Sequence, residues 1–233
     1  MRASNPYKLL IFDWDGTLMD SLAKIVACLH AAVVRAGLPP RTDAQLRHII
    51  GLGIHEAIDY LFPEGLFPET RQLVVETYRH QFLYADMTPA RLFDGVEAML
   101  DTLSARGYYL AIATGKSRSG LDLLLRELGL SHRFHTSRCA DETCSKPDPR
   151  MLIEILSELD VEPGQALMIG DTEFDVQMAK YAGVDAVAVS HGAHTRQQLL
   201  AASPLALLEN VTNLLSWLAC EGSVDICPER QKT

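Results

Sequence analysis

The sequence predicts an α/β protein in which a doubly wound parallel sheet carries helices on both faces and a smaller all-helical segment follows the first strand. Short apolar runs alternate with amphipathic stretches along most of the chain, which is typical of parallel strands joined by crossover helices. The interval from Asp20 to about Thr88 breaks this rhythm, because its pattern is helical throughout and it is too long for one crossover. A chain of 233 residues has room for one core domain and such an insertion.

The elements follow from apolar periodicity, in chain order. The first apolar run, Leu9–Asp13, suits a buried strand. Helices are expected next at Leu22–Ala36, Asp43–Ile50, His55–Phe62 and Glu69–Tyr84. The remaining strands are expected at Tyr109–Thr114, Phe134–Ser137, Ala166–Gly170, Ala186–Ser190 and, weakly, Leu205–Leu208. Helices between and after them are expected at Val96–Arg106, Ser117–Leu128, Arg150–Leu159, Glu173–Tyr181 and Asn210–Leu218.

These elements predict a Rossmann-like core domain formed by residues 1–19 and 89–233, with a helical domain of residues 20–88 inserted after the first strand. Residues 221–233 are polar and contain Gly222 and Pro228, so we expect a loosely held tail there.

Composition excludes several classes of function. The net charge of -9 argues against a nucleic-acid-binding surface, which would show a basic face. No apolar run approaches the ~20 residues that span a bilayer, and Met1–Tyr7 lacks the apolar core of a signal peptide, so we expect a cytoplasmic protein without a membrane partner. The five cysteines are unpatterned and odd in number, which favours free thiols in a reducing compartment.

The first strand ends in Asp13-Trp14-Asp15-Gly16-Thr17. A regular strand would point Asp13 and Asp15 to the same side, and two converging carboxylates repel unless a cation lies between them or one keeps its proton. Gly16 allows a sharp backbone turn directly afterwards. This run therefore indicates a metal-assisted nucleophile.

Polar residues recur where other strands end. Thr114-Gly115-Lys116-Ser117 follows the second core strand, Asp171-Thr172-Glu173-Phe174-Asp175 follows the fourth, and Ser145-Lys146-Pro147 precedes a helix. Each piece alone has a structural explanation, since Thr and Ser cap helices, Thr172 and Asp175 fit a capping pattern, and a loop lysine is usually solvated.

Together, these residues supply what phosphoryl transfer needs at one sheet edge. Asp13 can attack phosphorus, and Asp15 can give a proton to the leaving alkoxide and later take one from water. Magnesium would neutralise Asp13, Asp171 and the phosphate, while Lys146 adds a fixed positive charge. Thr114 and backbone N–H groups would bind phosphate oxygens.

With these motifs the chain resembles the phosphatases of the haloacid dehalogenase superfamily, in the phosphoglycolate-phosphatase-like group with a helical cap of the C1 type. The resemblance implies that residues 20–88 are the cap and that the substrate is a small phosphorylated metabolite, such as a phosphoglycolate-like compound or a sugar phosphate. It also implies Asp13 as nucleophile and Asp15 as general acid/base. Phosphate would be bound by Thr114, Gly115 and Lys146, and Mg2+ by Asp13, the Asp15 main-chain carbonyl and Asp171, with Asp175 in support.

Single residues argue for or against the other activities that similar proteins have. A dehalogenase does not need the second carboxylate, so Asp15 argues against one. Sugar-phosphate mutases of the superfamily share most of the chemistry. Thr17 favours hydrolysis over mutase activity only modestly. Lys24 could act as the cap lysine of a phosphonate-cleaving relative, but a surface position is the better interpretation. Phospho-accepting receiver domains are about half as long and lack the helical insertion.

Substrate specificity is expected to come from the cap. Arg47, His48, His55 and the turn Gly51-Leu52-Gly53 could face the site, although most cap Arg and His residues are solvated. His191 and His194 flank Gly192 after the fifth strand, and without a third ligand nearby in the sequence a surface loop is expected there.

Overall fold

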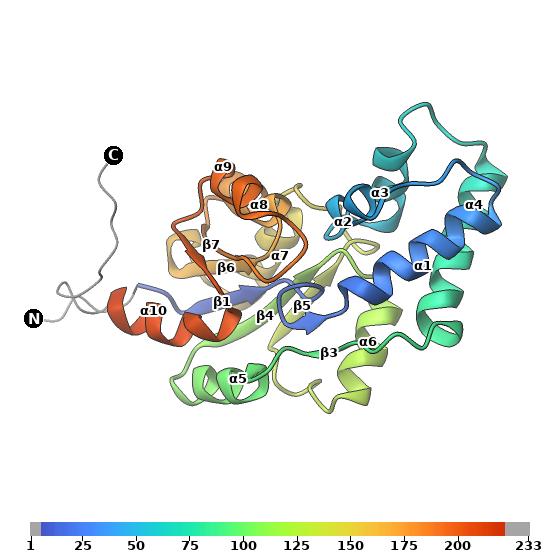
Figure 1. The fold of residues 1–233 in the computed structure, drawn as a ribbon. Coiled ribbons are helices and arrows are strands. Elements are labelled where there is room, and N and C mark those ends of the chain that lie inside the picture. The colour runs from blue at the N-terminus through green and yellow to red at the C-terminus, as the bar shows by residue number, and fades with distance from the viewer. Residues whose placement is uncertain (1–5, 222–233) are drawn as a thin grey trace, which may run out of the picture.

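The computed structural model describes residues 6–221, with a six-stranded sheet at the centre of the molecule (Figure 1). Its strands are β1 (Leu9–Phe12), β4 (Tyr109–Thr114), β5 (Thr136–Cys139), β6 (Ala166–Gly170), β7 (Asp185–Val189) and β8 (Ala206–Leu208). They lie in the order β5-β4-β1-β6-β7-β8, and all neighbouring pairs run parallel. The winding reverses at β1, and in such sheets ligands bind at the carboxyl ends of the strands beside this switch point.

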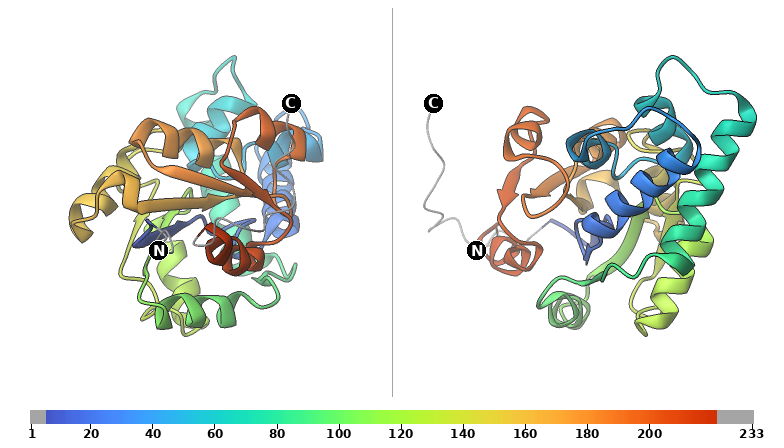
Figure 2. Two further views of the ribbon diagram at one scale, coloured as in Figure 1. Left: turned by 90° about the vertical axis from the view of Figure 1, so that its left-hand side faces the viewer. Right: turned by 45° about the vertical axis from the view of Figure 1, so that its right-hand side comes forward.

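Helices cover both faces of the sheet, because the strands are apolar on both sides. Leu10 and Phe12 of β1 pack in one apolar cluster, and Leu9 and Ile11 pack in another on the opposite face. The first cluster is covered by α5 (Val96–Ala105), α6 (Arg118–Glu127) and α10 (Leu214–Glu221). The second is covered by α7 (Arg150–Leu159), α8 (Glu173–Ala182) and α9 (Arg196–Ala201). Figure 2 shows these layers on either side of the sheet, and the predicted doubly wound α/β fold is confirmed.

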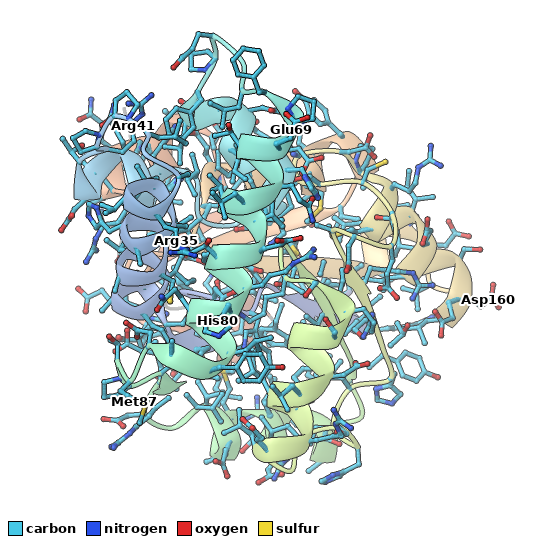
Figure 3. The ribbon with its side chains drawn as sticks, turned by 90° about the vertical axis from the view of Figure 1, so that its right-hand side faces the viewer. Arg35, Arg41, Glu69, His80, Met87 and Asp160 are labelled. Carbon is cyan, nitrogen blue, oxygen red and sulfur yellow. The ribbon has the colours of Figure 1, made fainter. Side chains whose placement is uncertain are left out.

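A helical module follows β1 and packs around an apolar cluster of its own. It consists of α1 (Leu22–Arg35), α2 (Asp43–His48), α3 (Ile54–Leu61), α4 (Pro68–His80) and the π-helical turn η1 (Gln81–Ala85). In Figure 3 α4 lies in front, from Glu69 in its first turn to His80 at its end. The module lies beyond the carboxyl ends of the strands, next to the switch point (Figure 1).

The structure differs from the sequence-based expectations in several places. Strand β2 (Met19–Asp20) pairs antiparallel with β3 (Arg91–Leu92) where the chain enters and leaves the helical module. Strands of two residues carry no periodicity, so the sequence gives no sign of them. The last helix begins at Leu214, after the 3₁₀ turn η3 (Val211–Asn213), and another 3₁₀ turn, η2 (Pro163–Gln165), precedes β6.

Two further expectations concern the chain ends and the thiols. The expected loose tail of residues 221–233 lies outside the described residues, except that Glu221 ends α10. Cys28, Cys139 and Cys144 are free thiols. None of the helices in residues 6–221 has the length and apolarity to cross a membrane.

Candidate active site

The loops that follow β1, β4, β5 and β6 bring the predicted site residues to one edge of the sheet. Asp13 directly follows β1, and its backbone N–H donates to the carbonyl oxygen of Ile169 at 2.9 Å, which extends the pairing of β1 with β6. Asp171 follows β6, and Thr114 is the last residue of β4. Asp13, Asp171 and Thr114 are all buried, as is Lys146 from the loop after β5. The structure therefore brings these four residues together at one edge of the sheet, as their positions after the strands predict.

Lys146 links two carboxylates in the centre of the site. Its Nζ lies 2.7 Å from Asp13 Oδ1 and 2.8 Å from Asp175 Oδ1, and its side chain is 0% exposed. Burial by itself lowers the pKa of an ammonium group, but the two carboxylates raise the pKa of Lys146 above its ordinary value. Lys146 is therefore a fixed positive charge and not a solvated loop lysine.

The carboxylates of Asp13, Asp171 and Asp175 lie within 4.8 Å of one another. Burial raises the pKa of Asp171 to about 7, with a further contribution from Asp175. Burial also raises the pKa of Asp13 well above its usual value, and the neighbouring carboxylates add to the effect of burial although Lys146 opposes it. Three buried carboxylates around one ammonium group leave excess negative charge, which a divalent cation would compensate.

The donor set fits a magnesium ion. Carboxylate oxygens are the hard ligands that Mg2+ prefers, and Asp13, Asp171 and Asp175 each present one such oxygen within 4.8 Å of the others. Asp13, Asp171 and Asp175 could therefore hold this ion.

Asp171 is held in place by two segments that the sequence did not associate with it. Thr17 Oγ1 donates to Asp171 Oδ1 at 2.7 Å, and the Ala193 backbone N–H donates to Asp171 Oδ2 at 2.7 Å. Gly16 has a φ of 83° and approaches so closely that a Cβ there would lie 2.2 Å from Asp171 Oδ2. At Gly192 a Cβ would lie 2.1 Å from the same oxygen. The carboxylate of Asp171 thus fits in a space that only glycines leave open.

Asp15 has partners of its own, separate from those of Asp13. Ser21 Oγ donates to Asp15 Oδ1 at 2.6 Å, and Lys116 Nζ lies 2.9 Å from Asp15 Oδ2. A regular strand would point both side chains to the same side, but β1 ends at Phe12, and the carboxylates of Asp13 and Asp15 have different partners. In the sequence Lys116 is only one residue of the run that follows the second core strand, and no signal there pairs it with Asp15.

The helical module lies directly on Gly115, one of the phosphate-binding candidates. A Cβ at Gly115 would lie 2.5 Å from the carbonyl oxygens of both Gly51 and Leu52. The Gly53 backbone N–H donates to Ser145 Oγ at 2.8 Å, beside Lys146. The turn Gly51-Leu52-Gly53 therefore reaches the site as expected, whereas Arg47 and His55 are exposed.

Thr172 and Asp175 serve both purposes that the sequence left open. They form a capping box at the start of α8, with Thr172 Oγ1 accepting the Asp175 N–H and Asp175 Oδ2 accepting the Thr172 N–H. The other carboxylate oxygen of Asp175 pairs with Lys146. The helix cap thus fixes the position of a carboxylate in the site.

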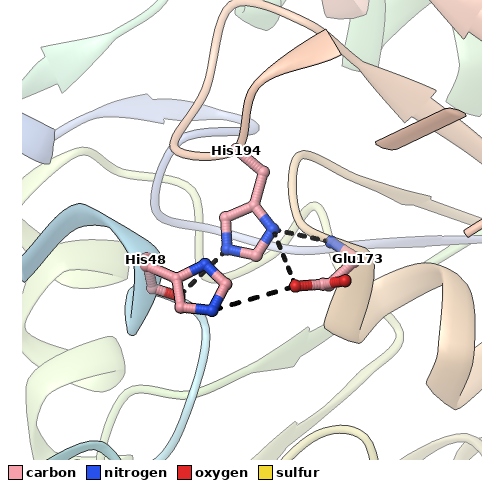
Figure 4. A group of neighbouring side chains, drawn as sticks. All are labelled: His48, Glu173 and His194. Atoms are coloured by element: carbon pink, nitrogen blue, oxygen red, sulfur yellow. Dashed lines mark hydrogen bonds and ion pairs between the residues drawn. The ribbon is translucent and has the colours of Figure 1, made fainter. Parts of the chain in front are cut away.

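His48, Glu173 and His194 form a second cluster of side chains, where the helical module meets the core (Figure 4). His194 is 2% exposed, so the expected surface loop is wrong; this loop folds back over Asp171. Its Nδ1 accepts the Glu173 N–H at 3.1 Å, and its Nε2 donates to the His48 carbonyl oxygen at 3.0 Å. Burial lowers the pKa of His194. With both ring nitrogens bonded to backbone groups, this cluster joins the module to the core and leaves no ring lone pair of His194 for a metal.

With the site in view, comparison with known sequences decides the family. The sequence profile of the haloacid dehalogenase-like hydrolases matches residues 10–189, a range that contains Asp13, Thr114, Lys146 and Asp171. The chain belongs to this family.

Individual relatives of this hydrolase agree with that assignment. It is 32% identical over 219 residues to the phosphoglycolate phosphatase of Rhodospirillum rubrum, covering 91% of this chain and 90% of the relative. It is 30% identical over 190 residues to the N-acetylmuramic acid 6-phosphate phosphatase of Pseudomonas aeruginosa, covering 79% and 82%. A solved structure of a hydrolase from Pseudomonas syringae superposes with a TM-score of 0.83 at 23% identity, covering 91% and 98%, and shares the fold. The expectation of a phosphoric monoester hydrolase similar to phosphoglycolate phosphatases is confirmed.

Proposed function

We propose that this hydrolase is a Mg2+-dependent phosphatase that releases phosphate from a small phosphorylated metabolite through a phosphoaspartyl intermediate. The observation that carries the proposal is the buried carboxylate of Asp13, whose Oδ1 pairs with Lys146 while Oδ2 has no partner among the described residues. A carboxylate oxygen held in a buried site and left without a donor is available for nucleophilic attack.

In the first step Asp13 Oδ2 attacks phosphorus, and the bond between phosphorus and the ester oxygen breaks. Asp15 gives its proton to the departing alkoxide. In the second step a water attacks phosphorus, Asp15 takes a proton from that water, and phosphate leaves with Asp13 restored. Ser21 and Lys116 hold the Asp15 carboxylate in one orientation for both transfers.

The remaining residues bind and orient phosphate and metal. Lys146 contributes its fixed positive charge, and Thr114 and the Gly115 backbone would bind phosphate oxygens. Asp13, the main-chain carbonyl of Asp15 and Asp171 would hold Mg2+, with Asp175 in support. When bound, the ion would neutralise the carboxylates and phosphate and polarise the phosphoryl group.

We further propose that residues 20–88 act as a cap domain on a core of residues 1–19 and 89–233. The separate apolar cluster of α1 to η1 and the contact of the turn at residues 51–53 with Gly115 support this division. The known relatives act on phosphoglycolate and on N-acetylmuramic acid 6-phosphate, which indicates a small phosphorylated metabolite here too. The cytoplasmic location stays a prediction of the sequence.

The function is tested with the Asp13→Asn variant and an aryl phosphate substrate. We expect wild-type protein to hydrolyse it, a chelator to abolish hydrolysis, and Asp13→Asn to lower kcat by at least ~1,000-fold. Asp160→Asn, in an exposed residue after α7, is the matched control and should keep full activity. Wild-type activity in Asp13→Asn would contradict the nucleophile assignment. Conversion of a bisphosphorylated sugar to its isomer without phosphate release would indicate the mutase instead.

A further inference from the structure

A pocket extends from Asp13 and Asp15 into the space between the core and the helical module. The module contributes mainly apolar side chains to its wall, among them Ile49, Leu52, Ile54, Ala57, Phe82 and Leu83. Asp13 lines the pocket and is buried, so a phosphate bound to it would place the rest of the ester among these side chains. This pocket is therefore the binding space of the leaving group.

Few polar groups of the pocket are free to bind that leaving group. Lys116 is already paired with Asp15 at 2.9 Å, and its Nζ lies 4.1 Å from the centre of the Phe82 ring. Arg79 lines the pocket but is an exposed residue. The hydroxyl of Tyr78 has no hydrogen bond to another residue in the range 6–221, and burial raises its pKa, so it remains a neutral phenol. Apart from the exposed Arg79, the module thus offers the Tyr78 hydroxyl as the polar side-chain group of an otherwise apolar wall.

The wall composition bears directly on the substrate. A sugar carries several hydroxyl groups, and each one that enters an apolar pocket without a partner weakens binding. A hydrophobic pocket discriminates against a single added hydroxyl by ~100-fold. A short carboxylate such as that of phosphoglycolate needs a cation. Of the two cations that line the pocket, Lys116 is held by Asp15, and Arg79 is exposed to solvent, which weakens its attraction for a carboxylate.

We propose that the substrate is the phosphate monoester of a predominantly apolar alcohol, aryl-alkyl or branched alkyl in character, whose carbon skeleton packs against Leu52, Ile54 and Phe82. The proposal rests on the proposed phosphatase function and names the substrate class of that site. Tyr78 supplies a hydrogen bond to a single polar group on such a skeleton.

The test compares monoesters whose leaving groups have similar intrinsic reactivity. Benzyl phosphate and glucose 6-phosphate both carry the phosphate on a CH₂ group next to a six-membered ring, and phosphoglycolate supplies the carboxylate. We expect kcat/KM for benzyl phosphate to exceed that for each of the other two by at least ~100-fold. Equal or higher kcat/KM for glucose 6-phosphate or phosphoglycolate would overturn the proposal.

Variants locate the preference in the pocket. Leu52→Asn replaces an apolar wall residue by a side chain of similar size and should lower kcat/KM for benzyl phosphate about tenfold. Leu73→Asn changes an exposed leucine of α4 outside the pocket and should have no effect. Acetyl phosphate, whose leaving group is too small to fill the pocket, should lose much less kcat/KM in Leu52→Asn than benzyl phosphate does. An unchanged preference for benzyl phosphate in Leu52→Asn would contradict the assignment.

A binding measurement separates this proposal from the phosphatase function. Calorimetry with wild-type protein compares benzylphosphonate with phosphonoacetate, neither of which can be hydrolysed at an ester bond. Tighter binding of benzylphosphonate supports the apolar pocket even if no ester is hydrolysed, in which case only the proposed function fails. Tighter binding of phosphonoacetate overturns the substrate class while leaving the phosphatase function in place.

Discussion

Replacement of Gly192 by alanine should damage the site without changing any proposed ligand. An alanine Cβ at this position would lie 2.1 Å from Asp171 Oδ2 and 2.4 Å from Asp171 Cγ. Ordinary contacts need about 3.4 Å, so the carboxylate of Asp171 would have to retreat by about 1 Å or more. Gly192 does not have a positive φ, so the effect comes from this collision and not from backbone strain.

The expected loss follows from that displacement. Misplacement of a catalytic group by about 1 Å costs about 100-fold in rate, and overpacking of this kind costs about 1–3 kcal/mol of folding stability. We therefore expect kcat/KM of Gly192→Ala to fall about 100-fold and its Mg2+ requirement to rise. Phosphatase assays across a Mg2+ titration measure both quantities, and thermal denaturation in the presence of chelator measures the stability.

Gly164→Ala is the matched control for this experiment. Gly164 also lacks a positive φ, no atom lies within 4 Å of its Cβ position, and it precedes β6 at the end of the strand away from the site. Gly192→Ala with the kcat/KM and Mg2+ requirement of Gly164→Ala would refute the role assigned to Asp171 and its surroundings.

Two further predictions concern the charges of the site. Lys146→Met removes the ammonium between Asp13 and Asp175 and leaves buried carboxylates unpaired. We therefore expect the free energy of unfolding, measured in urea, to fall by about 3–5 kcal/mol. An unchanged free energy of unfolding would contradict the buried pairing. The folded-state pKa of Asp171 is raised from 3.8 to about 7, so folded protein keeps a proton that unfolded protein has released. In chelator, its contribution should therefore make the melting temperature fall as pH rises from about 4 to about 7, and added Mg2+ should raise that temperature more at pH 7.5 than at pH 5. Equal stabilisation by Mg2+ at both values would refute this second prediction.

The local pattern of apolar residues in the sequence was sufficient to predict most of the fold. The apolar runs at Leu9–Phe12 and Ala166–Gly170 predict buried strands because both faces of a parallel sheet are covered, so every residue of such a strand is apolar. The pairing of Met19–Asp20 with Arg91–Leu92 could not be predicted, since segments of two residues have no period and meet only after the helical module has folded between them.

The sequence by itself determined the parallel sheet, the helical insertion and the polar residues at the strand ends, because each depends on spacing within a few residues. Only the tertiary structure decided which of these side chains meet. Asp13 lies with Asp171, Asp175 and Lys146, whereas Asp15 pairs with Lys116 and Ser21. The close approach of Gly192 to Asp171 and the apolar wall opposite the site also emerge only from packing, because they join segments far apart in the chain.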